Sequence, residues 1–158
     1  MPDPELVAES VGRAYAPLRR GDGLAPFPLT DGLKETMWVH CGLVRTRAGL
    51  LEARERLAEL QEESSRVSVA GPLEANPAWQ QALDLESQLT VARLIVESAL
   101  AREESRGAHF RADFPERDDD GWLRAVVVAV GANGEPELTT RPVELTRLAP
   151  HGRVLEQA

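Results

Sequence analysis

The chain holds a single cysteine, Cys41, among its 158 residues. One thiol cannot build an internal disulfide framework, and it cannot supply the several cysteines that iron–sulfur clusters and structural zinc sites require. We therefore expect Cys41 to behave as a small buried hydrophobic residue. A reducing compartment, the cytoplasm, is the natural setting for such a chain.

The sequence also lacks long apolar runs and a surplus of positive charge. No run approaches the roughly 20 residues that a membrane-spanning helix needs, so direct membrane insertion is not expected. The first ten residues, MPDPELVAES, lack the basic start and apolar middle of a secretory signal. The formal charge is −8. An acidic surface repels nucleic acids and anionic membranes, which excludes both as expected partners.

A glycine-rich dinucleotide fingerprint, G-x-G-x-x-G, is likewise missing from the sequence. Gly21-Asp22-Gly23 comes nearest, but no apolar strand precedes it and the third glycine is absent. Without that turn a pyrophosphate has no helix N-terminus prepared to receive it. We therefore expect no cofactor to bind to this chain by itself.

What the sequence does contain is a long helical periodicity after Asn76-Pro77, an asparagine cap followed by a proline at the first helical position. Apolar residues then recur at three- and four-residue spacing: Leu85, Leu89, Ala92, Val96, Ala99 and Leu100. Leu94 and Ile95 widen the stripe, so more than one face must be covered. Gly107 is expected to end this helix in the left-handed conformation.

Shorter helices are predicted before it. Pro4 to Leu18 is expected to form an entry helix, and Ala25 to Leu29 an extended segment because of its two prolines. Thr30 or Asp31 can cap a helix that runs to about Val44, and Thr46 can cap another from Arg47 to about Ser64. The tryptophans are expected to pack in the core or at a domain junction: Trp38, Trp79 and Trp122.

The period changes to that of strands near the end of the chain. Trp122 to Val130 and Pro136 to Leu148 are predicted as strands, joined by a loop that contains Asn133-Gly134. The predicted fold is mainly α, an antiparallel three-helix bundle of the spectrin-repeat type with a C-terminal β-hairpin. The expected division is 1–29 as an entry segment, 30–107 as the bundle, and 108–158 as charged loop, hairpin and tail. His151 to Ala158 is expected to fray.

The charged loop holds the residues that could carry chemistry. Arg106, His109 and Arg111 could grip a carboxylate. Alternatively, they could pin the loop by pairing with neighbouring acids: Glu103, Glu104, Asp113, Glu116 or Asp118. Glu103-Glu104 and Asp118 to Asp120 lack the converging spacing of a cation site, and His40 with Cys41 lacks a third ligand. We therefore predict no metal site, and no Ser–His–Asp or Cys–His set supports a catalytic site.

The same loop carries a resemblance to a known family. Ala101 to Asp119, AREESRGAHFRADFPERDD, resembles the ESRGAH-x-R-x-D-[FY]-P-x-RDD signature of the succinate dehydrogenase and fumarate reductase flavoproteins. Met37-Trp38 with Gly42 to Arg45, and Asn76 to Leu89, resemble two further stretches of their C-terminal region. L-aspartate oxidase, a close relative, has a similar but less complete motif. The match covers about Leu29 to Pro150.

The resemblance implies a helical domain that stands beside an FAD-binding domain or subunit, with no activity of its own. The whole enzyme would be an FAD-dependent dicarboxylate oxidoreductase, or alternatively L-aspartate oxidase of NAD biosynthesis. A further alternative is a free-standing, non-catalytic helical interaction module. An iron–sulfur subunit is a second candidate partner, and partners could hold the chain at the inner face of a membrane. The candidate docking loop comprises Arg106, His109, Phe110, Arg111 and Asp113.

Overall fold

The computed structural model describes residues 3–131 and 136–145. Five helices and two strands lie within these ranges: α1 Pro4–Arg19, α2 Pro26–Cys41, α3 Arg47–Ser64, α4 Pro77–Ala101, α5 Asp119–Trp122, β1 Arg124–Val130 and β2 Pro136–Pro142. The predicted mainly helical fold with a C-terminal hairpin is confirmed.

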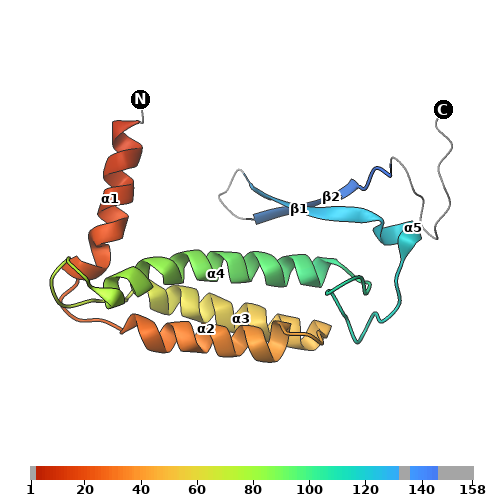
Figure 1. The fold of residues 1–158 in the computed structure, drawn as a ribbon, viewed down its shortest axis with the longest axis horizontal. Coiled ribbons are helices and arrows are strands. Elements are labelled where there is room, and N and C mark those ends of the chain that lie inside the picture. Colours follow the sequence, from red (N-terminus) through yellow and green to blue (C-terminus); the bar gives the residue numbers. More distant parts are fainter. Residues whose placement is uncertain (1–2, 132–135, 146–158) are drawn as a thin grey trace.

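The centre of the molecule is the bundle of α2, α3 and α4, in which successive helices run antiparallel (Figure 1). The predicted apolar stripes meet in its core. Leu50 and Leu60 of α3 are fully buried, as is Val96 of α4, while Leu85 and Leu89 of α4 are almost so. The periodicity of the sequence therefore identified the faces that pack together.

The helix caps of α3 and α4 are as predicted. The Thr46 hydroxyl accepts a hydrogen bond from Gly49 N, and the Asn76 side chain accepts one from Trp79 N. Each side chain satisfies a backbone N–H that has no acceptor within the first helical turn. These two caps fix where the helices begin.

The start of α2 differs from the prediction. α2 begins at Pro26 and ends at Cys41. Residues 26–29, predicted to be extended, are therefore helical, and Thr30 and Asp31 lie inside the helix and do not cap it. Prolines are tolerated in a first turn because the N–H groups they lack would have no helical acceptor there. Burial of Pro26 and Leu29 favours this earlier start.

The end of α4 also differs. The helix ends at Ala101, and Gly107 does not close it. Gly107 does adopt a positive φ of 57°, but within the tight turn that pairs Arg106 with His109. Glycine adopts this conformation without the steric penalty that a Cβ brings. The residue's conformation was predicted correctly and its role was not.

The entry helix α1 stands away from the bundle (Figure 1). Only its C-terminal end is held, because Tyr15 lies against Trp79 at 5.4 Å between ring centroids and Trp79 Nε1 donates to Ala14 O at 2.7 Å. Pro17 lies inside the helix near its end. Trp38 is 78% exposed, so it does not lie in the core, and its alternative place at a domain junction stays a prediction.

The hairpin follows the short helix α5. Trp122, predicted to begin the first strand, is the last residue of this helix, and β1 begins at Arg124. β1 and β2 pair antiparallel, with Arg124 opposite Pro142 and Val130 opposite Pro136. In a two-stranded sheet both strands are edges, so Pro142 is tolerated. The Asn133-Gly134 loop and the predicted frayed end at 151–158 lie outside the described residues, as does the strand prediction beyond 145. No helix within the described ranges is long and apolar enough to cross a membrane.

Core packing can be tested on α4 with a matched pair of truncations. Leu89 is 2% exposed and Val91 is 55% exposed on the same helix. We expect Leu89→Ala to lower the free energy of unfolding by about 2–5 kcal/mol, since it leaves a cavity. Val91→Ala should change it by about 0.5 kcal/mol or less. Urea denaturation measures both, and equal losses would mean that the faces of α4 are wrongly assigned.

Candidate functional site

The candidate docking loop closes the end of the bundle where α4 finishes and α3 begins (Figure 1). It is strapped to the turn between α2 and α3 by backbone hydrogen bonds. Arg45 N donates to Phe110 O at 3.1 Å, and Ala112 N donates to Arg45 O at 2.8 Å. These bonds form a short parallel β-bridge between Arg45 and Arg111, which fixes the loop against the turn.

Arg111 is the most deeply placed of the predicted site residues, with no exposed surface. Its guanidinium donates to Ala99 O at 2.7 Å and to Arg102 O at 3.2 Å, which are carbonyls at the end of α4. Nε and Nη2 form a two-pronged ion pair with Asp113, both contacts at 2.8 Å. A cation is favoured at this position because the carbonyl end of a helix carries partial negative charge.

Asp113 completes this arrangement. Hydrogen bonding to Arg111 is the largest cause that holds the pKa of Asp113 well below its ordinary value of 3.8. The carboxylate also accepts a hydrogen bond from Arg47 N at 2.9 Å, at the start of α3. Through Arg111 and Asp113 the end of α4 is thus joined to the start of α3.

A second ion pair lies beside the first, and its acid, Glu104, is one of the pairing partners that the sequence offered. Glu104 has no exposed surface, yet it accepts from Arg106 Nε at 2.9 Å, from Arg106 Nη2 at 3.0 Å and from Asp118 N at 3.0 Å. Burial acts to raise the pKa of Glu104, but these hydrogen bonds and nearby positive charges outweigh it and lower the pKa. Arg106 also bonds Asp119 at 2.8 Å.

Arg102 extends the network to the hairpin. Its guanidinium bonds Glu104 and the carbonyls of Trp122 and Arg124, and it lies 5.1 Å from the ring centroid of Trp122. A guanidinium over an aromatic face is favourable, since the ring face is electron-rich. This contact links the bundle to β1.

His109 is held by a donor on one side and an acceptor on the other. Arg45 Nη1 lies 3.0 Å from Nδ1, and Arg102 O lies 3.2 Å from Nε2. Because arginine can only donate and a carbonyl can only accept, this geometry fits the neutral imidazole with its proton on Nε2. Burial is the largest cause that lowers the pKa of His109, and the neighbouring arginines add to it.

Most of the predicted site residues therefore hold the loop in place through contacts within the chain. Four of them form side-chain hydrogen bonds to partners within the chain: Arg106, His109, Arg111 and Asp113. Phe110 differs, since it is 40% exposed. Sequence reasoning named Glu104 among the possible acidic partners of these residues, but it missed the supporting roles of Arg45 and Arg102.

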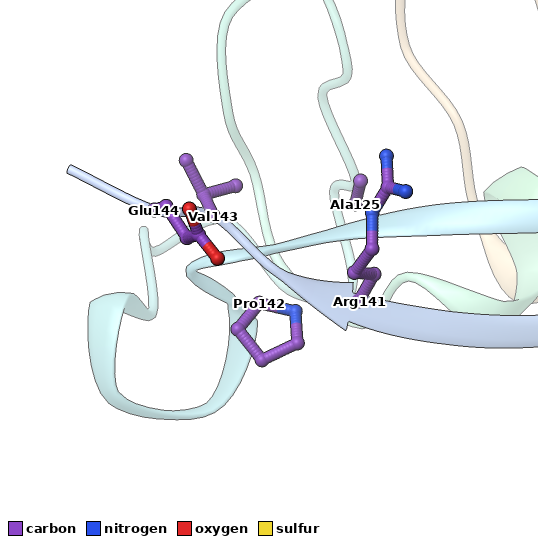
Figure 2. Close-up of a pocket in the computed structure, with 5 residues that line it drawn as sticks. All are labelled: Ala125, Arg141, Pro142, Val143 and Glu144. Carbon is purple, nitrogen blue, oxygen red and sulfur yellow. The ribbon is translucent and has the colours of Figure 1, made fainter. Parts of the chain in front are cut away.

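Elsewhere the described residues offer little for catalysis or metal binding. They contain no group of three or more histidine, cysteine or carboxylate side chains that could hold a metal ion. Figure 2 shows a hollow at the end of the hairpin, where the ring of Pro142 points to the opposite side of the strand from Arg141. Arg141 and Glu144 are the charged residues among the described ones that line it, and this lining includes no serine, threonine, cysteine, lysine or histidine.

Comparisons with known proteins place this geometry in context. The family described as fumarate reductase flavoprotein C-term matches residues 30–155 of the chain. The chain is 35% identical over 127 residues to the fumarate reductase flavoprotein subunit of Haemophilus influenzae. The aligned region covers 80% of this chain and 21% of that protein. The chain is 31% identical to the succinate dehydrogenase flavoprotein subunit of Rickettsia bellii, over 99% of the chain and 27% of that protein.

A solved structure gives the same result for the fold. The chain superposes on the Sdh1 complex of Mycobacterium smegmatis in its apo form with a TM-score of 0.81 and 30% sequence identity. The superposition covers 95% of this chain and 27% of that one. The chain thus spans about a fifth to a quarter of the length of these three proteins.

The Arg111 brace can be tested by truncation. Arg111→Ala removes the donors of the α4 carbonyls and leaves Asp113 without its ion pair. We expect the free energy of unfolding to fall by about 3–5 kcal/mol, since removing one partner strands the other. Arg54→Ala, at an exposed position on α3, is the control and should change it by about 0.5 kcal/mol or less. If Arg111→Ala lost as little stability as the control, the Arg111 contacts would be dispensable for folding.

The neutral state of His109 predicts a pH dependence. A histidine whose pKa is lower in the folded chain takes up its proton mainly on unfolding, so its contribution is complete above about pH 6.5. Stability should therefore decline as the pH falls from that value toward the lower pKa of the folded state. We expect His109→Gln to flatten this decline in denaturation midpoints measured between about pH 7.5 and 5.5.

His40→Gln, on α2, is the matched control because it removes an imidazole outside the braced loop. It should retain the loss of stability on the acid side. If the wild-type chain and His109→Gln lose stability in parallel, His109 is not the group that takes up the proton.

Proposed function

We propose that this chain, which belongs to the C-terminal domain family of the succinate dehydrogenase and fumarate reductase flavoproteins, packs against the flavin-binding part of an FAD-dependent dicarboxylate oxidoreductase. In that role it supplies no catalytic group. It provides a rigid helical support that the flavin-binding part needs for assembly.

One observation carries the proposal: the similarity covers the chain and only 21–27% of the related flavoprotein subunits. The sequence has no G-x-G-x-x-G turn, so the pyrophosphate of FAD has no helix N-terminus prepared for it here. Flavin binding would therefore come from a domain or subunit outside these residues. An iron–sulfur subunit would be a further partner.

The choice of a dicarboxylate oxidoreductase over L-aspartate oxidase has support in the sequence. Residues 117–119 read RDD, Trp122-Leu123 follows, and Arg141 to Val143 read RPV. These stretches resemble the succinate dehydrogenase and fumarate reductase branch, whose chemistry is hydride transfer between succinate or fumarate and FAD. The substrate is a proposal that rests on this resemblance.

The braced loop is the proposed docking edge, but through its exposed residues. Phe110 is held beside Val44 by the strap between Arg45 and the loop, and Leu43 and Val44 are strongly exposed. Aromatic and apolar residues on a rigid frame are suited to burial against another protein, because little conformational entropy is lost there. The buried pairs of Arg106 and Arg111 would keep that frame in shape.

The proposal predicts how flavin is distributed. The purified chain should show no flavin absorption band, whereas the flavin-binding part of the same enzyme, expressed as a separate polypeptide, should carry FAD and bind this chain. Measuring the visible spectrum of each component and their affinity by calorimetry tests both statements. Stoichiometric flavin absorption by the purified chain would contradict the proposal. A failure of the two parts to associate would contradict it as well.

A further inference from the structure

Two adjoining hollows form one groove along the outer face of α4. The first lies between α2 and α4 and is lined by Met37, Val91 and Ile95 among others. The second continues past the same Val91 and Ile95 to Arg45 and His109 of the braced end, with the hairpin on its far side. The two hollows meet at Val91 and Ile95, and together they are here called the α4 groove.

The two residues that both hollows share form an apolar stripe that the described part of the chain leaves partly exposed. Val91 is 55% exposed and Ile95 is 44% exposed, one turn apart on α4. The wide stripe on this helix predicted that a second face would be covered. The hairpin approaches α4 at Leu94, and its Val126 lines the second hollow, yet the described residues leave about half of Val91 and Ile95 exposed.

The charge that lines the groove is the opposite of the charge of the protein. The chain carries a net charge of −8. Among the described residues that line the two hollows there is no aspartate or glutamate, and the charged residues are Lys34, Arg45 and Arg102. Arg102 is paired with Glu104, so Lys34 and Arg45 are the cations that an occupant can meet. A locally cationic groove on an acidic protein selects for an acidic occupant, because like-charged surfaces are repelled.

Arg45 is the lining cation best placed to form an ion pair with such an occupant. Its guanidinium bonds Cys41 O at 3.1 Å and His109 Nδ1 at 3.0 Å, and within the described residues it has no carboxylate partner. At the other end Lys34 lies only 3.9 Å from Asp31, with both side chains mostly exposed. Exposed pairs of this kind contribute little, so Lys34 can exchange its partner readily.

The length of the groove favours a protein segment over a small molecule. The α4 residues that line it extend from Ser87 to Arg102, which at about 1.5 Å per residue is roughly 22 Å. A second copy of this chain is a poor occupant, since a two-fold interface would bring the same cations together. An amphipathic helix with an apolar stripe and carboxylates at its edge matches both the length and the charge.

We infer that the α4 groove seats an acidic amphipathic helix of the flavin-binding part. The apolar stripe of that helix covers Val91 and Ile95, and its carboxylates face Arg45 and Lys34. The inference rests on the proposed function for the identity of the partner, and adds the surface and the chemistry of the segment that binds. The groove adjoins the proposed docking edge at His109, so one partner can cover both surfaces.

The test compares binding of groove variants to the FAD-loaded flavin-binding part, expressed as a separate polypeptide. Val91→Asp places a carboxylate on the apolar stripe and should weaken binding at least about tenfold. Lys34→Glu should weaken it about threefold and reduce its dependence on salt. Leu6→Asp on α1 and Arg54→Glu on α3 repeat the same chemical changes outside the groove and should leave the affinity within about twofold.

The outcomes separate this inference from the proposed function. Circular dichroism and thermal midpoints of the isolated variants should match the wild-type chain, since each substituted residue is exposed. If the wild-type chain binds and the groove variants bind equally well, the groove inference is overturned and the proposed function stands. If the wild-type chain does not bind, both are overturned. Loss of self-association in Val91→Asp, measured by sedimentation, would make the occupant a second copy and overturn the inference.

Discussion

The interaction on which the rest of the structure depends is the buried contact of Arg111 with the end of α4 and with Asp113. A charged group without exposed surface is costly unless every donor has a partner. Here the guanidinium satisfies carbonyls that α4 would otherwise leave unpaired, and Asp113 balances its charge. Since Asp113 also accepts from Arg47 N, the same contact sets the end of one helix against the start of another.

This arrangement changes what the conspicuous residues of the loop can do. Arginine, histidine and aspartate in one short motif suggest a site that grips a carboxylate. The folded chain uses those groups to hold itself, with Arg106 on Glu104 and His109 between Arg45 and Arg102. A frame fixed in this way can present apolar residues without losing its own shape on binding. The surface proposed for recognition therefore consists of residues that the motif does not emphasise.

Much of the bundle followed from the sequence. The apolar spacing identified the buried faces of α3 and α4, and Thr46 and Asn76 marked where those helices begin. These features are local, because a helix face is set by 3.6-residue periodicity and a cap by a side chain that lies within three residues of its partner. The hairpin was predicted for the same reason, although α5 took Trp122 from its first strand.

Only the tertiary structure decided which residues of the loop are buried and which end of α4 they close. Gly107 is typical of a helix stop, yet α4 ends at Ala101, and Arg111, twelve residues beyond Ala99, donates to the Ala99 carbonyl. The burial of Glu104 and the exposure of Trp38 were also invisible beforehand. Sequence patterns report contacts between near neighbours, whereas the cost of burying a charge depends on partners that only the folded chain brings together.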